Sequence, residues 1–126
     1  MSRLAYQYVA VRCVPRVDRE EFVNVGVVLF CHASDFLDMA WHCDEHRLSA
    51  LDPEIDLAAV RSTMSSMERV CRGDDTAGAV ARQTQGQRFG FLKAPKSTVL
   101  QPGPVHGGLT VDPARQLEHL LERLVS

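Results

Sequence analysis

The residues with the most versatile chemistry lie in the last third of the sequence, around His106. The imidazole of His106 titrates near neutral pH, and Lys96 and Ser97 add a cation and a hydroxyl upstream. Residues 101–108 begin with Gln101 and are rich in proline and in glycine, which lets a ligand approach the backbone closely. This pattern predicts a loop that binds an anion or a partner. A general base needs an orienting neighbour, and the sequence places none beside His106, so we predict a binding role; a rigid structural turn is the alternative.

The charge distribution points to the same region. Residues 76–111 contain no Asp or Glu, although the whole chain has a net charge of −2. The basic residues in this stretch are Arg82, Arg88, Lys93 and Lys96. Such asymmetry is typical of a face for phosphate, nucleic acid or an acidic protein, and equally of an ordinary solvated face. Phe89 and Phe91 would be the stacking groups for a nucleic acid, but a pI of about 6.2 argues against that class.

Two polar residues stand out within apolar surroundings. Asn24 is the amide in an otherwise apolar segment, and a buried amide needs hydrogen-bond partners. It either orients a ligand or bonds the backbone of a neighbouring loop such as residues 16–21. Arg47 also lies between apolar residues, and we expect it to form a buried ion pair. Its candidate partners are Asp52, Glu54 and Asp56.

We expect neither a metal ion nor any other cofactor. A zinc site needs about four ligands that converge on one point, and the candidates are Cys31, His32, His42, Cys43 and His46. The hairpin predicted below separates them along its strands, and neighbours such as His42 and Cys43 point to opposite faces of a sheet. The sequence also lacks the phosphate-binding loop, the dinucleotide fingerprint, the metalloprotease motif and the nucleophile elbow.

An antiparallel sheet is predicted to position these residues. Three segments have the alternating or continuously apolar pattern of strands, namely residues 4–14, 22–33 and 36–43. A two-residue turn at Ser34-Asp35 would join the last two as a hairpin. That register pairs Phe30 with Met39 and Val28 with Trp41 on one face of the sheet. We also predict two short strands, residues 89–92 and 98–101.

Two amphipathic helices are predicted from their caps and apolar stripes. Asp52-Pro53 has the N-cap and proline signal of a helix start, and Gly73 is the expected end of that helix. Asp112-Pro113 repeats the signal before a C-terminal amphipathic helix. Residues 44–51 and 77–83 form short helices or turns. The fold class is therefore α+β: an antiparallel sheet of three or more strands with a central hairpin, and helices packed on it.

Length and composition predict one soluble domain over residues 1–126. The chain has 45% hydrophobic and 24% charged residues, which excludes a disordered chain. A membrane span needs about 18 consecutive apolar residues, and the longest apolar run is much shorter. The first residues lack the apolar core of a signal peptide, so we expect a cytoplasmic protein. The four scattered cysteines are expected to be reduced and structural.

Several stretches share a pattern with known proteins. They are Tyr6–Val14 with Glu21–Leu29, Arg47–Pro53, and Ala94–Pro102 with Pro104–His106. Through them, and over nearly its whole length, the chain resembles the bacterial family catalogued as domain of unknown function 3037. The resemblance implies a small stand-alone bacterial protein without an established activity, often encoded beside a HipA-like kinase-fold protein. It supplies no catalytic residues, and Gly103 stands where relatives usually have serine.

These observations lead to three hypotheses. The first is a non-catalytic partner of another protein, such as a HipA-like kinase-fold protein. The second is an enzyme or binding module for phosphate or a nucleotide, built around Lys96 and His106. The third, which we disfavour, is a nucleic-acid-binding protein. The candidate residues for binding a partner or ligand are Asn24, Arg47, Arg88, Lys96, Ser97, Gln101 and His106. Oligomeric state is not predicted, and a membrane partner is not expected.

Overall fold

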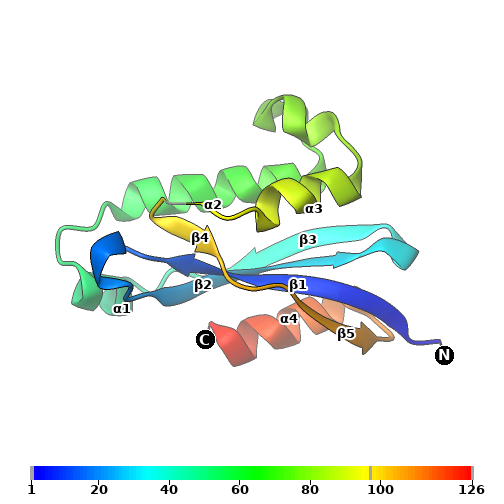
Figure 1. Cartoon of the computed structure of the whole chain (residues 1–126), viewed down its shortest axis with the longest axis horizontal. Helices are drawn as coiled ribbons and strands as arrows, with labels where there is room; N and C mark the ends of the chain where they lie inside the picture. Colours follow the sequence, from blue (N-terminus) through cyan, green and yellow to red (C-terminus); the bar gives the residue numbers. More distant parts are fainter. Residues whose placement is uncertain (1, 97, 126) are drawn as a thin grey trace.

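The computed structural model describes residues 2–96 and 98–125 and has three layers (Figure 1). An antiparallel sheet forms the middle layer, helices α2 and α3 cover one of its faces, and α4 covers the other. The α+β class, the central hairpin and the C-terminal amphipathic helix are therefore confirmed. Within the described residues, no helix is both long and apolar enough to cross a membrane.

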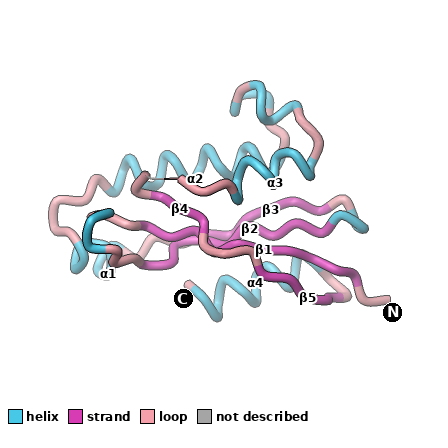
Figure 2. The backbone as a smooth tube through the Cα atoms, viewed as in Figure 1, coloured by secondary structure: helices cyan, strands magenta, loops and turns pink. Residues whose placement is uncertain are grey.

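The sheet is built around the first strand of the chain. Over the described residues its strands are β1 (Leu4–Cys13), β2 (Val23–Cys31), β3 (Phe36–Trp41), β4 (Leu100–Pro102) and β5 (His106–Thr110). β2 lies along one edge of β1, and β3 follows β2. β4 and β5 share the other edge of β1, as the tube in Figure 2 shows. Between them the chain stays attached to β1, because the Gly103 N–H donates to the Ala10 carbonyl (2.7 Å).

The predicted hairpin is confirmed, but its register is shifted by two residues. Val28 pairs with Met39 rather than with Trp41, because the turn is longer than predicted. It consists of a 3₁₀ turn, His32–Ser34, and Asp35 in the left-handed region (φ 51°). Side chains alternate with a period of two, so a shift of two residues leaves every side chain on its predicted face.

A bulge in β2 changes which face its first residues occupy. The pairing of β1 with β2 skips Val25, and an extra residue of this kind reverses the alternation of side chains. Strict alternation along residues 22–33 would place Val23, Val25 and Val27 on one face of the sheet. Instead, Val23 and Val25 pack with Val28 on the α2 side, whereas Val27 packs toward α4.

The helices differ from prediction mainly at their starts. Over the described residues they are α1 (Glu45–Leu51), α2 (Leu57–Arg72), α3 (Gln85–Lys93) and α4 (Pro113–Leu124), and short 3₁₀ turns at Asp75–Ala77 and Ala79–Arg82 precede α3. The N-cap of α2 is Asp56 rather than Asp52, because Asp52 ends α1 and its carbonyl accepts from Ile55 in a turn. Gly73 ends α2 with a φ of 68°, as predicted.

Residues 85–93 form a helix where we predicted a strand. The Thr84 side chain accepts from the Gln87 N–H while Gln87 Oε1 accepts from the Thr84 N–H, so the helix begins with a capping box. α3 buries Phe89, which is 1% exposed and packs on Phe30 with ring centroids 5.3 Å apart. Phe89 is thus a core residue, and the prediction of a stacking role for it is wrong.

Residues 106–110 form a strand where we predicted a loop. β5 pairs with β1 from Leu4 to Tyr8. The Tyr6 ring lies directly over Gly108, and a Cβ at this position would come within 2.6 Å of the Tyr6 hydroxyl oxygen. Glycine therefore occurs in this strand to admit an aromatic ring, not to make the chain flexible.

Candidate functional site

The residues predicted to form one binding face lie on opposite sides of the sheet. His106 stacks on Tyr8, with ring centroids 5.2 Å apart, and Tyr8 packs with the α4 cluster. Lys96 instead lines a groove beside α2. Ser97 lies outside the described residues. His106 and Lys96 therefore do not form a common site.

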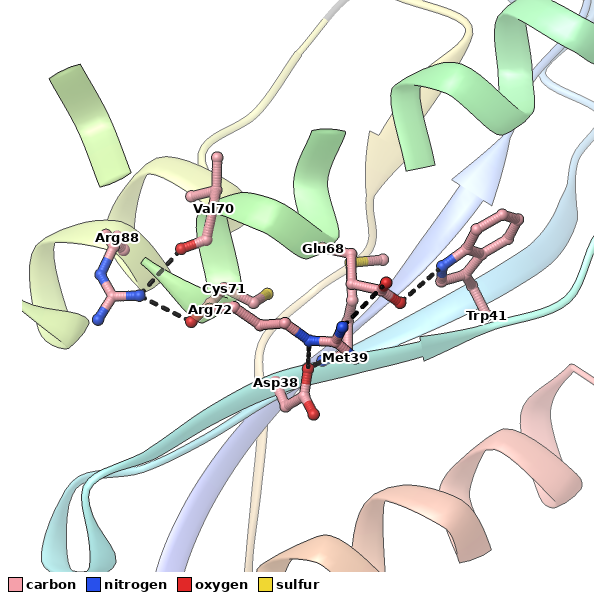
Figure 3. A network of polar contacts seen from close by, with 8 residues as sticks. All are labelled: Asp38, Met39, Trp41, Glu68, Val70, Cys71, Arg72 and Arg88. Carbon is pink, nitrogen blue, oxygen red and sulfur yellow. Dashed lines mark hydrogen bonds and ion pairs between the residues drawn. The ribbon is translucent and has the colours of Figure 1, made fainter. Parts of the chain in front are cut away.

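Arg88 holds the end of α2, as Figure 3 shows. Its side chain is buried, Nη1 donates to the carbonyls of Val70 (2.9 Å) and Cys71 (2.7 Å), and Nε donates to the Gln83 carbonyl (3.1 Å). The last carbonyls of a helix have no partner within the helix. The Val70 carbonyl also accepts from the Gly73 N–H (3.1 Å), so the Cys71 and Gln83 carbonyls are the ones that depend on the guanidinium. Its geometry is that of a structural residue.

Lys96 and Gln101 also bond backbone carbonyls. Lys96 Nζ donates to Phe91 (2.8 Å) and Ala94 (3.2 Å) at the end of α3, and it lies 5.0 Å from the centroid of the Phe91 ring. Partial burial lowers the pKa of Lys96 from its ordinary value, because it disfavours the charged form. Gln101 Nε2 donates to the Thr98 carbonyl (2.8 Å).

Asn24 and Arg47 hold the end of α4. Asn24 Nδ2 donates to the Leu124 carbonyl (3.1 Å), and Arg47 Nη1 donates to the Val125 carbonyl (2.9 Å). Asn24 therefore bonds backbone, as one of its two interpretations predicted, although the backbone belongs to α4. The predicted buried ion pair of Arg47 is wrong: Arg47 is exposed, and Asp52 lies 3.8 Å from Arg16 instead.

A second polar network in Figure 3 joins α2 to β3. The indole Nε1 of Trp41 donates to Glu68 Oε2 (3.0 Å). Arg72 lies between two carboxylates, 3.5 Å from Glu68 and 3.7 Å from Asp38. Because these ion pairs are partly exposed, each contributes at most about 1 kcal/mol. The network orients α2 on the sheet and leaves its charged groups paired.

The cysteines and histidines are dispersed. Within residues 2–96 and 98–125, no three His, Cys, Asp or Glu side chains gather as metal ligands would. All four cysteines are buried free thiols. Burial raises the pKa of Cys71 to about 12 and that of Cys13 to about 11, so at neutral pH these thiols are protonated and weak nucleophiles.

A groove of about 810 Å³ opens between α2 and the chain that leads from α3 into β4. Its floor includes Val11, Leu92 and Leu100 from the core. At the rim, Phe91 is 48% exposed and Val99 is 41% exposed. Large apolar side chains exposed along one groove are typical of a binding surface, so this groove is the candidate functional site.

One wall of the groove is a face of α2 that we did not predict as functional. It consists of Ala59, Thr63, Ser66 and Val70, which are spaced by three or four residues and so lie along one line of the helix. The apolar stripe of α2 runs beside it: Met64 and Cys71 pack into the core, whereas Val60 and Met67 also line the groove. The available signal was the small size of these side chains, which keeps the wall low enough for another segment to approach.

The two ends of the groove carry opposite charges. Asp52, Glu54 and Asp56 line the end near the start of α2, and Arg69 lines the other. Asp56 and Arg69 are 13 positions apart in sequence, which corresponds to about 20 Å along a helix axis. Lys96 adds a second basic group to the lining. The groove is therefore apolar in the middle and electrically polarised along its length.

Comparison with known proteins places the chain in a family. No curated protein and no solved structure matches it. A family model described as "Protein of unknown function (DUF3037)" matches residues 8–125, nearly the whole chain. The chain belongs to this family of proteins of unknown function.

Proposed function

We propose that this protein is a non-catalytic binding module that holds an amphipathic helix of a partner protein in the groove beside α2. The observation that carries the proposal is the open apolar groove of about 810 Å³ with Phe91 and Val99 exposed at its rim. An amphipathic helix laid into an apolar groove is a recurring mode of protein recognition.

The chemistry of the lining supports binding rather than catalysis. A general acid and a general base that act together must both lie within hydrogen-bond reach of the reacting groups. The acidic residues of the groove lie at one end, and Arg69 lies about 20 Å away at the other. Lys96 is engaged by the carbonyls of Phe91 and Ala94. The middle of the groove offers apolar contacts and few reactive groups.

The charges of the groove define the partner segment. Its helix should present apolar residues at i, i+3, i+4 and i+7, with basic residues at the end that meets Asp52, Glu54 and Asp56, and acidic residues at the end that meets Arg69. Helices are more stable with acidic residues in the first turn and basic residues in the last turn. The partner helix should therefore lie antiparallel to α2.

The first partner to test follows from the family resemblance. A HipA-like kinase-fold protein encoded next to this chain would be co-produced with it, and we propose such a protein as the source of the helix. Its surface should carry an amphipathic helix with the charge order described above.

Two neighbouring alanines of α2 provide a matched pair of variants. Ala59 lines the groove, whereas Ala58 is exposed on α2 outside it. The probe is a synthetic helical peptide with acidic residues first, an apolar stripe, and basic residues last; a second peptide has the charges exchanged. Binding is measured by calorimetry, first with the peptides and then with the purified kinase-fold protein.

We expect the first peptide to bind more tightly than the second. Ala59→Arg should weaken its binding at least about tenfold, since a buried mismatch of about 1.4 kcal/mol has that effect, and Ala58→Arg should leave it unchanged. Equal loss in both variants, or equal binding of both peptides, would contradict the proposed mode. Binding of the peptide but not of the kinase-fold protein would retain the groove and reject that partner.

A further inference from the structure

A second surface lies on the α4 side of the sheet, where α4 leaves part of β1 and β5 uncovered. α4 packs on β2 and β3, and beside it three aromatic rings form a row. Tyr6 stacks with Tyr8 at 6.2 Å, and Tyr8 stacks with His106 at 5.2 Å, both with ring planes 29° apart. His106 is exposed on β5. Burial raises the pKa of Tyr6, Tyr8 raises it further, and Arg123 opposes the shift, so Arg123 is also close to this row.

Arg12 lies on the same face, four residues further along β1. At a rise of about 3.3 Å per residue, the Cα atoms of Tyr8 and Arg12 are about 13 Å apart. The guanidinium carbon is 4.2 Å from the centroid of the Phe22 ring. On Gly103, a Cβ would lie 3.2–3.3 Å from the atoms of the same guanidinium. The arginine is therefore held in place by its surroundings.

The polar atoms at this position are not satisfied by the protein. Among the described residues, Arg12 Nε and Asn24 Oδ1 are buried and have no hydrogen-bond partner. Arg12 and Asn24 are paired across β1 and β2, so the unpaired donor and the unpaired acceptor belong to directly opposite residues of the sheet. Buried polar atoms are almost always paired, and such a pair points to a ligand that both accepts and donates hydrogen bonds.

Arg12 also lines a cleft of about 350 Å³. The other lining residues are Val14, Val17, Glu20, Phe22 and Gln101. A guanidinium packed against an aromatic ring retains its edge for binding, and that edge matches a carboxylate or phosphate. Glu20 is the acidic residue of the lining, and its repulsion favours a ligand with a single phosphate over a polyphosphate.

We propose that this surface binds a nucleoside monophosphate unit. The base stacks on Tyr8 and His106, since aromatic side chains accept any base, and the phosphate accepts hydrogen bonds from Arg12. The unit comes either as a free nucleotide or as part of a single-stranded nucleic acid, because both present the same base and phosphate. This site is separate from the groove and does not depend on the function proposed for it.

The test is an NMR titration of the ¹⁵N-labelled protein with four probes. They are adenosine monophosphate, adenosine, inorganic phosphate, and oligothymidylate of about ten nucleotides. We expect the monophosphate to shift the amide signals of Tyr8, Arg12 and His106. Adenosine and phosphate should bind at least about tenfold more weakly, because each makes only one of the two contacts.

Substitutions separate the two contacts. Arg12→Gln should weaken monophosphate binding about tenfold to a hundredfold, the effect of losing a charge-assisted hydrogen bond. His106→Ala should weaken it about fivefold or more through lost stacking. Arg82→Gln removes the same charge from an exposed position that lines neither the groove nor the cleft, and it should leave monophosphate binding unchanged. If Arg12→Gln does not fold, His106→Ala, at an exposed position, decides the question.

Each outcome has a defined meaning. Oligothymidylate binding much more tightly than the monophosphate would support the proposal with a single strand as the source, and the reverse would support it with a free nucleotide as the source. Phosphate binding as tightly as the monophosphate would overturn the stacking contact and with it the proposal. Absence of shifts at Tyr8, Arg12 and His106, or shifts confined to the groove, would overturn it as well.

Discussion

Replacing Arg88 by methionine should cost this protein a large part of its stability. Methionine keeps the apolar stem of the side chain and removes the guanidinium. The carbonyls of Cys71 and Gln83 then lose their donor, whereas the Val70 carbonyl keeps the Gly73 N–H (3.1 Å). Arg88 was predicted to bind a ligand or partner, and a large loss of stability would instead establish it as a structural residue.

The magnitude follows from the number of carbonyls left unpaired. A buried acceptor without a partner costs about 1–3 kcal/mol. With values near the low end, because water reaches the helix end in the variant, the two carbonyls give a loss of about 2–3 kcal/mol. For a urea m-value of about 2 kcal/mol/M, the unfolding midpoint falls by about 1–1.5 M. Arg88→Lys keeps a charge but not the fork of donors, so it should lose about half as much.

Urea unfolding followed by the fluorescence of Trp41, the sole tryptophan of the chain, measures these changes. Arg69→Met is the matched control, because Arg69 is exposed on α2 and its side chain donates to the exposed face of the same helix, at Ser66. The free energy of unfolding of this variant should stay within about 0.5 kcal/mol of the parent value. If the free energy of unfolding of Arg88→Met falls by less than about 1 kcal/mol, the capping argument is refuted.

Three further predictions concern the core and the helix ends. Gly26→Ala should lower the free energy of unfolding by about 1–3 kcal/mol, because its Cβ would lie 3.1 Å from Trp41 Cβ and 3.2 Å from the Ala40 carbonyl oxygen, which cannot rotate away; an unchanged urea midpoint would mean that β3 shifts to make room. Asn24→Asp should be less stable than Asn24→Ala, because a carboxylate would face the Leu124 carbonyl without a donor; the order of their urea midpoints checks this. The pKa of Cys71 is raised from 9.0 to about 12 by burial. The unfolded thiol therefore loses its proton first, and stability should fall as pH rises from 9.0 toward 12; Cys71→Ala should flatten this slope.

Most of the sheet could be predicted because local sequence patterns indicate strands. β1, β2 and β3 were recognised from alternation and apolar runs. The predicted hairpin register differs from the observed one by two residues, because Asp35 takes a left-handed conformation that nothing in Ser34-Asp35 requires. The bulge at Val25 was not predictable from residue types, because valine fits either face of a covered strand.

The two wrong assignments have different physical causes. α3 contains two glycines, which disfavour a helix. Its alternating Phe89-Gly90-Phe91 resembles the pattern of a strand. Its capping box, Thr84 with Gln87, was readable in the sequence and should have decided for a helix. β5 was hidden by its glycines, and the reason for one of them, the Tyr6 ring over Gly108, exists only in the folded protein.

The roles of the candidate site residues were the least predictable part. Arg88 bonds carbonyls 17 and 18 positions away, and Asn24 bonds one 100 positions away. No local pattern encodes such distances. Sequence analysis singled out Asn24 as an amide among apolar residues that needs partners, and Arg88 only as a basic residue of the acid-free stretch. It could not tell a helix end from a ligand.

The way in which the helices end has a consequence for local motion. The last turns of α2, α3 and α4 are bonded by side chains of Arg88, Lys96, Asn24 and Arg47, which come from other segments. Helix ends normally fray independently of the rest of a protein. Here fraying at the ends of α2 and α4 must first break bonds to side chains from distant parts of the chain. Amide hydrogens in these last turns should therefore exchange with solvent mainly through opening of the whole fold, whereas the first turns of the same helices exchange through local opening.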